Sequence, residues 1–539
     1  MVYKSCMTHE EKAAALGRDE ASRKEIVALL ALNAELDERC AELERQVAWF
    51  QRQIFGSKSE RRLETPDARQ LALGESFAAG APTPPPSITV PSHARRQPKK
   101  LWEGTPDDSG LRFDPSVPVQ EIRIPNPEAA TLAPGEYMVI GEKATYRLAQ
   151  RPGSYVVLKY VREVIKHRST AGVLCPPAPP AVLEKSFADV SFLAGLLVDK
   201  FLYHLPLYRQ HQRLQDGGIR LARATLTNLV HRSLMLLEPV YEAQVQSILA
   251  SRVLAMDETP IRAGRQPEKK GKMQSAYFWP MYGDRDEIVF PFATSRSLAV
   301  PSKLLAPFSG TLLTDGYWVY DSYVEMVRGR RAQCWTHVRR TMDEAAIAER
   351  GLSMQAIDLI GVIYAHEAVI RERGLAGLDK LAYRVEHCKP AVDRFFVWLR
   401  DTLRDRIFVP SNPFAKAAAY ITKRETELRV FLEDPEVPVD TNHLEREIRP
   451  IALGRRNWLF CWTEVGAKYV GIAQSLIRTC RLQGVDPHTY LVDVLQRVAT
   501  HPAAEVELLT PRLWKERFPA NPLRSDVDSC QVTPVTNTS

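Results

Sequence analysis

The amino-terminal residues carry hydrophobic side chains at the spacing of a coiled-coil helix. One heptad position is occupied by Ile26, Asn33, Cys40, Val47 and Ile54, and the other by Leu29, Leu36, Leu43 and Phe50. Leucine repeating at the second position, with an asparagine at the first, is typical of a parallel two-stranded coiled coil. We therefore predict that residues 1–63 form a dimerisation helix, the alternative being a single helix packed against its own domain.

Proline and basic residues replace this pattern over residues 64–118. The run Pro84-Pro85-Pro86 favours an extended, solvated chain, so we predict a linker here. Its basic residues at 95–100 fit an arm that follows a nucleic-acid backbone. They fit a stretch that only improves solubility equally well.

Strand-like runs predict a small β-rich module at residues 119–182, and helical periodicity predicts a different structure at 183–250. The strand candidates of the module are Val119–Ile124, Tyr137–Ile140 and Ser154–Lys166. The helix candidates that follow are Phe192–His204, Leu207–Gln215 and Ala224–Leu237.

A glycine-containing break at residues 216–218 separates the second and third of these helices. Such a break fits a helix-turn-helix that binds DNA. The basic residues that would contact DNA are Arg209, Arg213 and Arg223. A three-helix packing unit without a DNA-binding role fits the same pattern.

Short apolar runs bounded by turn residues predict a sheet from residue 251 onward. The strand candidates are Val253–Met256, Ser275–Tyr282, Glu287–Thr294, Thr311–Thr314 and Ala332–His337. Residues 283–286 form a hairpin-turn signal, Pro260 closes the first strand, and residues 302–307 fit a short helix. Three strands, a helix and further strands is the order of a ribonuclease-H-like fold. We predict that residues 251–340 are the first part of such a core.

Helical patterns dominate the rest of the chain. Residues 341–425 are predicted to be a helical insertion, with helices that include Ala356–Arg371 and Pro390–Leu403. The second part of the core is predicted at 426–500, where Asp440 would cap a short helix that runs to Pro450. Residues 501–539 are predicted to be a carboxy-terminal tail, with a last helix at Leu508–Phe518 and a disordered end from Ser525. The predicted fold class is therefore multidomain α/β.

Composition restricts the classes of function. At 539 residues the chain is too long for one core, and 45% hydrophobic with 25% charged residues is usual for a soluble protein. The net charge of +7 indicates an acidic partner only weakly. Eight cysteines without a C-x-x-C pair favour reduced thiols. No apolar run reaches the ~18 residues of a membrane span, so we expect a cytoplasmic protein without a membrane partner.

Three acidic residues are candidates for catalysis. Asp257 and Asp315 each follow a predicted strand, and Glu445 lies within the predicted short helix. Two strand-end aspartates and a helical glutamate can bind two divalent metal ions at the spacing used for phosphodiester cleavage. Any one of these carboxylates alone is more simply explained as a solvated turn residue. Their order along a ribonuclease-H-like sequence favours the catalytic interpretation.

Several motifs in one order resemble the transposases of the insertion-sequence sixty-six family, which carry an Asp-Asp-Glu triad. The motifs include Asp257-Glu258-Thr259-Pro260, Thr314-Asp315-Gly316-Tyr317, Cys334-Trp335-Thr336-His337, Asp440-Thr441-Asn442-His443-Leu444-Glu445-Arg446 and Leu453-Gly454-Arg455-Arg456-Asn457-Trp458. The resemblance covers most of residues 20–500. It implies a DNA transposase of a bacterial insertion sequence, with a ribonuclease-H-like catalytic core.

The resemblance also implies a chemistry and a set of partners. Asp257, Asp315 and Glu445 would be the catalytic residues and the ligands of two Mg²⁺ ions about 4 Å apart, for which Mn²⁺ could substitute. The reaction would be strand cleavage at element ends followed by joining to target DNA. Double-stranded DNA would be the substrate of a nucleoid-associated homodimer, joined through the coiled coil and assisted by small accessory proteins.

Basic residues around the triad are candidates for DNA contacts. They are His337, Arg340, Arg446, Arg449, Arg455, Arg456 and Trp458. Guanidinium groups suit phosphate contacts, and the indole of Trp458 could stack on an unpaired base. The alternatives are a structurally satisfied His337 and an ordinary buried Trp458.

Two departures from the family pattern limit what the resemblance implies. The family's zinc-binding module has two cysteine pairs, whereas only Cys175 remains here, so we expect no structural zinc. Thr441-Asn442 and His443-Leu444 replace the family's asparagines and small residues, although Glu445-Arg446 is intact.

Two other functions fit part of the sequence. A catalytically inactive DNA-binding protein derived from a transposase would keep the fold but would be expected to have a broken triad, whereas the triad here is complete. A metal-dependent DNA nuclease would use the same triad without strand transfer. The sequence favours the transposase over both.

Overall fold

The structure is a computed structural model that describes residues 111–529, apart from positions 116, 128, 130–136, 152, 168–172 and 266–271. The predicted coiled coil at 1–63 and residues 64–110 of the predicted linker lie outside the described residues. The described residues all belong to one unit of the chain, residues 98–539. They form a mixed α/β structure with several sheets, which agrees with the predicted class.

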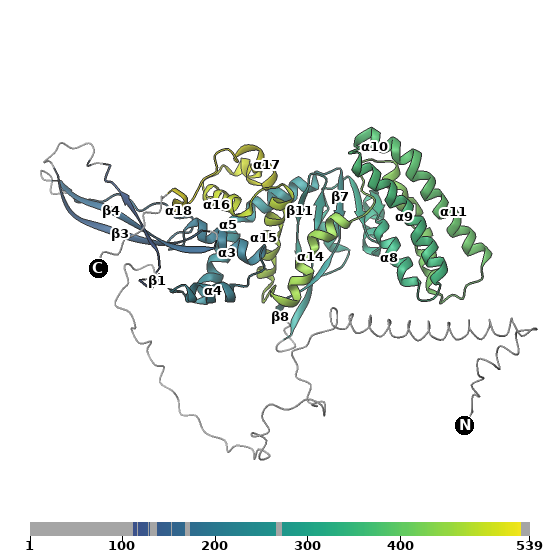
Figure 1. Ribbon diagram of the computed structural model, residues 1–539, viewed down its shortest axis with the longest axis horizontal. Helices are drawn as coiled ribbons and strands as arrows, with labels where there is room; N and C mark the ends of the chain where they lie inside the picture. The colour runs from purple at the N-terminus through teal and green to yellow at the C-terminus, as the bar shows by residue number, and fades with distance from the viewer. Residues whose placement is uncertain are drawn as a thin grey trace, which may run out of the picture. The chain divides into compact units, whose positions relative to one another are not determined.

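A five-stranded mixed sheet positions the candidate catalytic residues (Figure 1). Its strand order is β11-β10-β7-β13-β14. Both β13 and β14 run parallel to β7, whereas β10 is antiparallel to β7 and β11 is antiparallel to β10. The strands are β7 (Val253–Met256), β10 (Met281–Gly283), β11 (Glu287–Val289), β13 (Thr311–Thr314) and β14 (Arg330–Gln333).

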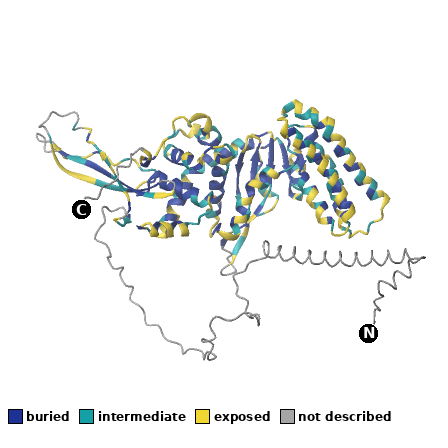
Figure 2. Cartoon of the chain, viewed as in Figure 1, coloured by how far each residue is buried: buried dark blue, intermediate teal, exposed yellow. Residues whose placement is uncertain are grey.

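Alternate residues of β7 enter two different hydrophobic clusters. Leu254 and Met256 pack with residues of α6 (Ala299–Leu304) and α7 (Trp318–Val327). Val253 and Ala255 belong to a larger cluster that includes residues of α14 (Asn442–Asn457) and α15 (Glu464–Leu482). Because both faces are covered, β7 is buried along its whole length and its sequence is an unbroken apolar run (Figure 2).

A second sheet, of order β12-β9-β8, is not predicted by the sequence pattern. It consists of β8 (Thr259–Arg265), β9 (Met273–Phe278) and β12 (Phe292–Ala293). The single strands predicted at Ser275–Tyr282 and Glu287–Thr294 are wrong, because each range contains a break between two strands. The first break includes Pro280 and the second includes Pro291. A proline has no N–H and cannot donate a hydrogen bond to a neighbouring strand.

Two predictions on the turns of this region have opposite outcomes. The hairpin turn predicted at 283–286 is confirmed, since Gly283 pairs with Glu287 across β10 and β11. The prediction that Pro260 closes a strand is wrong. Pro260 lies inside β8, which tolerates a proline because it is an edge strand.

The strand predicted at Ala332–His337 is shorter than expected. It ends at Gln333, and α8 (Trp335–Ala345) begins two residues later, so His337 lies on a helix and not at a strand end. A tertiary contact explains the early start of the helix. The backbone N–H of Trp335 donates to the carbonyl of Val439, and the Trp335 indole is fully buried against Phe395, Phe396 and Phe431.

A helical segment follows α8 and covers the predicted insertion. Its elements are α9 (Arg350–Glu372), α10 (Gly377–Tyr383), η2 (Arg384–Cys388), α11 (Lys389–Asp405), α12 (Pro413–Thr422), α13 (Glu425–Arg429) and η3 (Val430–Leu432). The chain then returns to the sheet at α14. That helix extends past the predicted end at Pro450 to Asn457.

The residues before the central sheet form the predicted strands and helices, but the lengths of several elements differ from those predicted. The long hairpin consists of β3 (Tyr137–Arg151) and β4 (Ser154–His167), flanked by β2 (Val119–Ile124) and β5 (Val173–Leu174). The helices are α3 (Val190–Phe201), α4 (Leu207–Asp216) and α5 (Arg223–Leu249). Helix α5 passes the predicted end at Leu237 and continues through Pro239 to the start of the sheet.

Two short strands correct the boundary of the predicted linker. β1 (Arg112–Phe113) pairs with β6 (Ile219–Arg220), which lies between α4 and α5. Leu111 and Val117 are buried. Residues 111–115, 117 and 118 therefore belong to the folded part of the chain and are not linker, because β1 pairs with β6 and the side chains of Leu111 and Val117 enter the core.

The carboxy-terminal elements are α16 (Pro487–Arg497), η4 (Ala503–Leu509), α17 (Pro511–Arg517) and α18 (Asp526–Ser529). The disordered end predicted from Ser525 is wrong for its first residues. Ser525 donates to Asp189 (2.6 Å), Asp526 accepts from Tyr160 (2.7 Å), and Val527 is buried. No helix among the described residues has the length and apolar character needed to cross a membrane.

Candidate active site

Asp257 and Asp315 directly follow two neighbouring parallel strands. In the register of β7 and β13, Ala255 pairs with Leu313, so the two aspartates come two residues later at the same end of the sheet. Both are partly buried. Asp257 Oδ1 accepts from the N–H of Glu258 (2.7 Å), and Asp315 Oδ1 accepts from the N–H of Tyr317 (2.9 Å). The sheet therefore presents two carboxylates side by side, as the sequence predicts.

Glu445 reaches the same end of the sheet because the start of α14 is tied to the end of β14. Thr441 donates to Cys334 Sγ through its N–H and its hydroxyl, at 3.3 and 3.2 Å. The helix cap is Thr441 and not the predicted Asp440, although Asp440 Oδ1 accepts from the N–H of Asn442 (3.0 Å). Glu445 lies in the first turn of this anchored helix.

The three carboxylates interact electrostatically. Burial raises the pKa of Asp257 to about 8, and the negative charges of Asp315, Glu258 and Glu445 contribute to the increase. Carboxylates at a buried site repel one another unless protons or cations neutralise them. The arrangement therefore favours the binding of positive charge between Asp257 and its neighbours.

The donor set fits hard divalent cations such as Mg²⁺, which bind carboxylate oxygens. Glu445 Oε1 is buried without a hydrogen-bond partner and is therefore free to coordinate an ion. Within the described part of the chain, no three His, Cys, Asp or Glu side chains already surround one metal position. Mg²⁺ is commonly held by one or two carboxylates together with water molecules, so this arrangement is compatible with ion binding.

His337 and Arg340 lie next to Glu445, on α8. His337 Nε2 is 3.8 Å from Glu445 Oε1, and Arg340 Nη2 is 3.4 Å from Glu445 Oε2. Burial lowers the pKa of His337, although the negative charges of Asp315 and Glu445 act to raise it. The two predicted DNA-contacting residues are thus brought to the carboxylates, where Arg340, whose side chain is half exposed, can reach a phosphate.

Glu258 forms a buried clamp beside Asp257 that sequence reasoning missed. Its side chain is only 2% exposed and pairs with Arg296, while Tyr320 Oη donates to Glu258 Oε2 (2.8 Å). Burial raises the pKa of Glu258, opposed by the hydrogen bonds from Arg296 and Tyr320. The sequence signal for this residue is its place directly after Asp257, in the motif Asp257-Glu258-Thr259-Pro260.

Tyr320→Phe is expected to destabilise the protein by about 1.5–3 kcal/mol, because it removes a hydrogen bond to a buried charged group. Tyr323→Phe on the same helix is the matched control, since Tyr323 Oη donates to the neutral carbonyl of Leu305 (3.0 Å). The control should cost about 0.5–1.5 kcal/mol. Chemical denaturation of both variants measures the difference, and equal costs would contradict the clamp.

A second group of residues holds the backbone at Asp315. Arg331, whose side chain is 3% exposed, donates to the carbonyl of Asp315 and pairs with Asp321. Gly316 leaves room for the Tyr420 ring, because a Cβ at this position would overlap Tyr420 Oη and the ring would have to move. No local sequence signal points to Arg331, whose partners come from separate elements.

The remaining DNA-binding candidates divide into three groups. Arg209, Arg446 and Arg449 are exposed, on α4 and α14, and Arg223 is exposed with its guanidinium 5.6 Å from the ring centre of Tyr208. Arg213 is engaged in the structure, with an ion pair to Asp199 and a hydrogen bond to Tyr155 (2.8 Å). Arg455 and Arg456 line a separate pocket beside β8.

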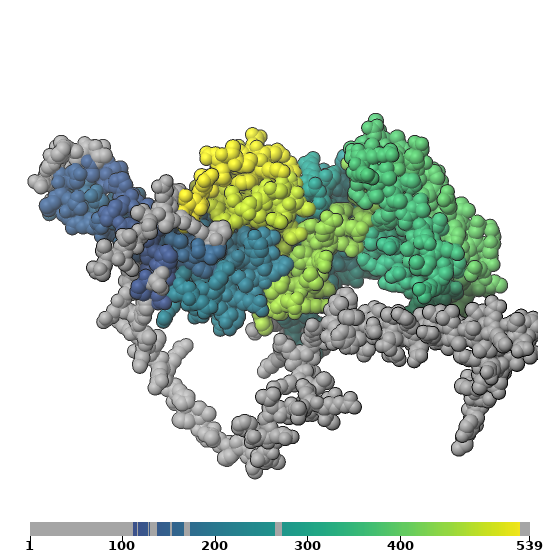
Figure 3. Space-filling view, viewed as in Figure 1, coloured from purple at the N-terminus to yellow at the C-terminus, as the bar shows by residue number. Residues whose placement is uncertain are grey.

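Of the two alternatives for Trp458, the structure favours an ordinary buried residue over one that stacks on a base. Trp458 is 7% exposed and its ring stacks on His204, with 4.5 Å between the ring centres. The indole also packs against Gly454, where a Cβ would lie 2.9 Å from it. Trp458 therefore joins α14 to the residues before α4. On the face shown in Figure 3, yellow-green residues that include α14 lie between the green helical segment and the blue helices α3 to α5.

Comparison with known proteins gives consistent matches along the chain. Residues 185–469 match the family model described as "Transposase IS66 family", and residues 475–511 match "IS66 C-terminal element". Residues 42–103 match "Transposase C of IS166 homeodomain". Three uncharacterized proteins of Sinorhizobium fredii are similar over nearly the full length. Protein y4hP is 30% identical over 507 residues (88% of each chain), y4jD is 28% identical over 502 residues (89% of this chain and 96% of y4jD), and y4qI is 26% identical over 533 residues (94% and 95%).

Proposed function

Because this chain belongs to the IS66 transposase family, we propose that it is an active DNA transposase of the Asp-Asp-Glu type. The observation that carries the proposal is the convergence of Asp257, Asp315 and Glu445 at one end of the central sheet. The proposed reaction is metal-dependent cleavage at element ends and transfer of the cut strand to target DNA. Its substrate is double-stranded DNA.

The proposed fold of the catalytic part is ribonuclease-H-like. Three antiparallel strands, β11, β10 and β7, are followed across the sheet by two strands parallel to β7. This order and these directions support the proposal. They also account for the position of the aspartates, since the ends of adjacent parallel strands meet at one edge of a sheet.

In this proposal Asp257, Asp315 and Glu445 hold Mg²⁺, for which Mn²⁺ substitutes. When bound, the ions would supply Lewis-acid chemistry, which would acidify a water or a DNA 3′-hydroxyl and stabilise negative charge on the leaving oxygen. Glu258, Arg296 and Tyr320 keep Asp257 in place through the buried clamp. Arg340 directs a phosphate toward Glu445, and His337 positions the Glu445 carboxylate.

The proposed assembly is a homodimer on DNA, joined through the coiled coil predicted for residues 1–63. A dimer would hold the two element ends together, which strand transfer requires. The match of residues 42–103 to a homeodomain description supports a DNA-binding role near this segment. Small accessory proteins and association with the nucleoid are further parts of the proposal.

The test is incubation of the full-length protein with an element-end duplex, a target duplex and Mg²⁺. Cleaved and joined products are expected. Cleavage without a joined product, with candidate helper proteins present, would replace the transposase by a metal-dependent nuclease. DNA binding without cleavage under any of these conditions would indicate an inactive DNA-binding protein derived from a transposase.

Mg²⁺ should raise the thermal unfolding midpoint of the protein, and should do so more at about pH 9 than at about pH 6. The folded pKa of Asp257, about 8, exceeds its ordinary value of 3.8. In ion-free buffer this carboxyl therefore stabilises the fold fully below pH 3.8, and that contribution is lost as the pH rises to about 8. Bound Mg²⁺ compensates for the lost proton.

Differential scanning fluorimetry with EDTA or Mg²⁺ measures this effect across the pH range. The control is Asp257→Asn, which lacks the titrating carboxyl and should show a weaker Mg²⁺ effect with little pH dependence. Equal Mg²⁺ effects in the two proteins would contradict the assignment of Asp257 as a ligand.

A further inference from the structure

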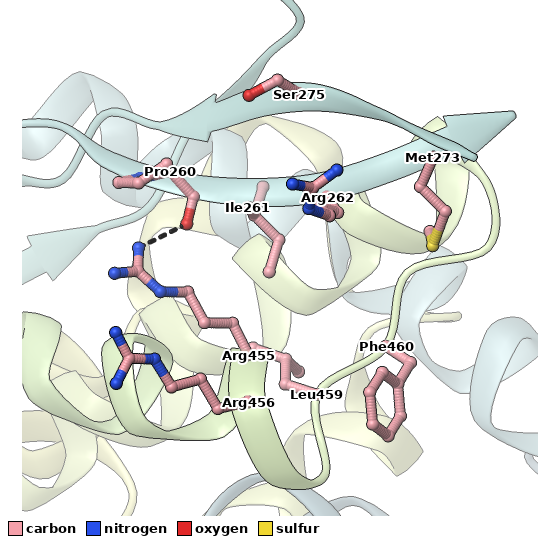
Figure 4. Close-up of a pocket in the computed structure, with 9 residues that line it drawn as sticks. All are labelled: Pro260, Ile261, Arg262, Met273, Ser275, Arg455, Arg456, Leu459 and Phe460. Atoms are coloured by element: carbon pink, nitrogen blue, oxygen red, sulfur yellow. Dashed lines mark hydrogen bonds between the residues drawn. The ribbon is translucent and has the colours of Figure 1, made fainter. Parts of the chain in front are cut away.

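A pocket of about 490 Å³ lies beside the candidate active site, between the β8–β9 pair and the end of α14 (Figure 4). Arg262 pairs with Ser275 across β8 and β9 and lines its wall. Arg455 and Arg456 enter it from the last turn of α14. A backbone bridge between Ala263 and Cys461 joins the segment after α14 to β8.

One side of the pocket is strongly basic. Arg455 Nη1 donates to the carbonyl of Pro260 (2.7 Å) and lies beside Arg456. Burial lowers the pKa of Arg455, and the charge of Arg456 lowers it further. Among the described residues, no carboxylate pairs with Arg262, Arg455 or Arg456.

Several other arginines near the sheet are paired with an acid. Arg296 pairs with Glu258, Arg340 with Glu445 and Arg478 with Glu447. The three pocket arginines therefore carry a concentrated positive charge that no carboxylate of the described residues neutralises. An anionic ligand would satisfy it, and phosphate oxygens match guanidinium groups in geometry as well as charge.

The opposite side of the pocket is apolar. Figure 4 shows Phe460 and Met273 on the side away from the guanidinium groups of Arg455 and Arg456, with Ile261 and Leu459 between the two sides. The Phe460 ring is 60% exposed, although it is adjacent to the buried Leu459. An exposed aromatic ring next to phosphate-binding charge is the combination that binds an unpaired base.

The pocket is connected to the catalytic carboxylates through two elements. β8 begins at Thr259, two residues after Asp257. The same helix, α14, carries Glu445 in its first turn and Arg455 near its end. Ten residues of helix separate them by about 15 Å, which is about four base-pair steps of B-DNA.

We propose that this pocket binds one unpaired nucleotide of the DNA strand whose phosphate lies at the catalytic carboxylates. Its base would stack on Phe460, and its phosphates would contact Arg262, Arg455 and Arg456. The volume suits a ligand of this size. This inference rests on the proposed function, and it adds a structural requirement, namely that the DNA is unpaired a few nucleotides from the cleavage point.

The test compares the binding of full-length protein to two fluorescein-labelled probes by fluorescence anisotropy. One probe is a random-sequence duplex, and the other is the same duplex with a short single-stranded extension of thymidines. The wild type should bind the extended probe roughly tenfold more tightly. Phe460→Ala should lose this preference while binding the plain duplex as the wild type does.

The matched control is Trp462→Ala. Trp462 is an aromatic residue with 67% exposure that does not line the pocket. It should keep the preference for the extended probe. Equal affinity of the wild type for both probes, or the same loss in Trp462→Ala and Phe460→Ala, would overturn the inference and leave the proposed function standing. Failure to bind either probe would overturn the proposed function itself.

A second measurement locates the nucleotide directly. With 5-bromodeoxyuridine in place of one thymidine of the extension, ultraviolet light should crosslink the probe to the peptide that contains Phe460. Crosslinks that map only outside the pocket would overturn the inference, even if the extended probe binds more tightly.

Discussion

Asp257→Asn is expected to lower the rate of DNA cleavage about a thousandfold or more without weakening the fold. The loss corresponds to the several kcal/mol of transition-state charge stabilisation that bound metal ions supply. Asparagine keeps the shape of the side chain but removes a carboxyl whose pKa is raised to about 8 by burial and by Asp315, Glu258 and Glu445. Removing that repulsion should leave the ion-free protein at least as stable as the wild type.

Asp315→Asn and Glu445→Gln should lose cleavage to a similar extent. Glu447 is not expected to replace Glu445, because it is buried and paired with Arg478 at 2.6 Å. The matched control is Glu325→Gln, an exposed acid of α7, which should cleave at the wild-type rate. The measurement is the single-turnover rate on an element-end duplex, with circular dichroism to verify folding. Full activity in any of the three triad variants would remove that residue from the catalytic site.

Arg384→Leu is expected to destabilise the helical segment by about 3–5 kcal/mol, because it leaves a buried carboxylate without a partner. Arg384 and Glu367 are both buried and form two hydrogen bonds, at 2.7 and 2.9 Å. Arg384 Nη1 also donates to the carbonyls of Phe431 (2.9 Å) and Val437 (3.0 Å). The pair thus joins α9 and η2 to the segment that leads to Asp440 and Glu445.

The control is the double variant Arg384→Met with Glu367→Leu. Replacing both members of a buried ion pair with apolar residues of similar size is often neutral or stabilising, so the double variant should recover most of the stability. Native-state hydrogen exchange of the α9 and α11 amides measures the opening free energy of this segment alone. Similar losses in the single and double variants would show that Arg384 acts mainly through its carbonyl contacts.

The sequence determines those structural features that depend on residues close together in the chain. The strands that carry Asp257 and Asp315 are apolar runs ending at an acidic residue, and they lie where the pattern predicts them. The hairpin at 283–286 is set by its own turn residues. Helix periodicity likewise locates α9 and α11. α11 extends the predicted range by one residue at its start and two at its end, whereas α9 begins six residues before the predicted Ala356.

The tertiary structure decides which of these elements meet. Asp257 and Asp315 come together only because β7 and β13 pair in parallel with Ala255 opposite Leu313. Glu445 joins them after a long helical segment because Thr441 binds Cys334. Neither contact produces a recognisable pattern in the sequence, since each depends on a partner that is distant along the chain.

The same reason explains the errors in assigning single side chains. Trp458 and Phe460 are both aromatic residues in a basic stretch, and only packing on His204 makes the first a core residue and leaves the second exposed. Arg213 is neutralised by Asp199, whereas Arg262, Arg455 and Arg456 face a pocket that no acidic side chain of the described residues lines. The sequence alone therefore located the strands that carry the two aspartates, several of the helices and the candidate carboxylates. Only the tertiary structure decided which charges and rings remain available to a ligand, because availability depends on neighbours that folding brings together.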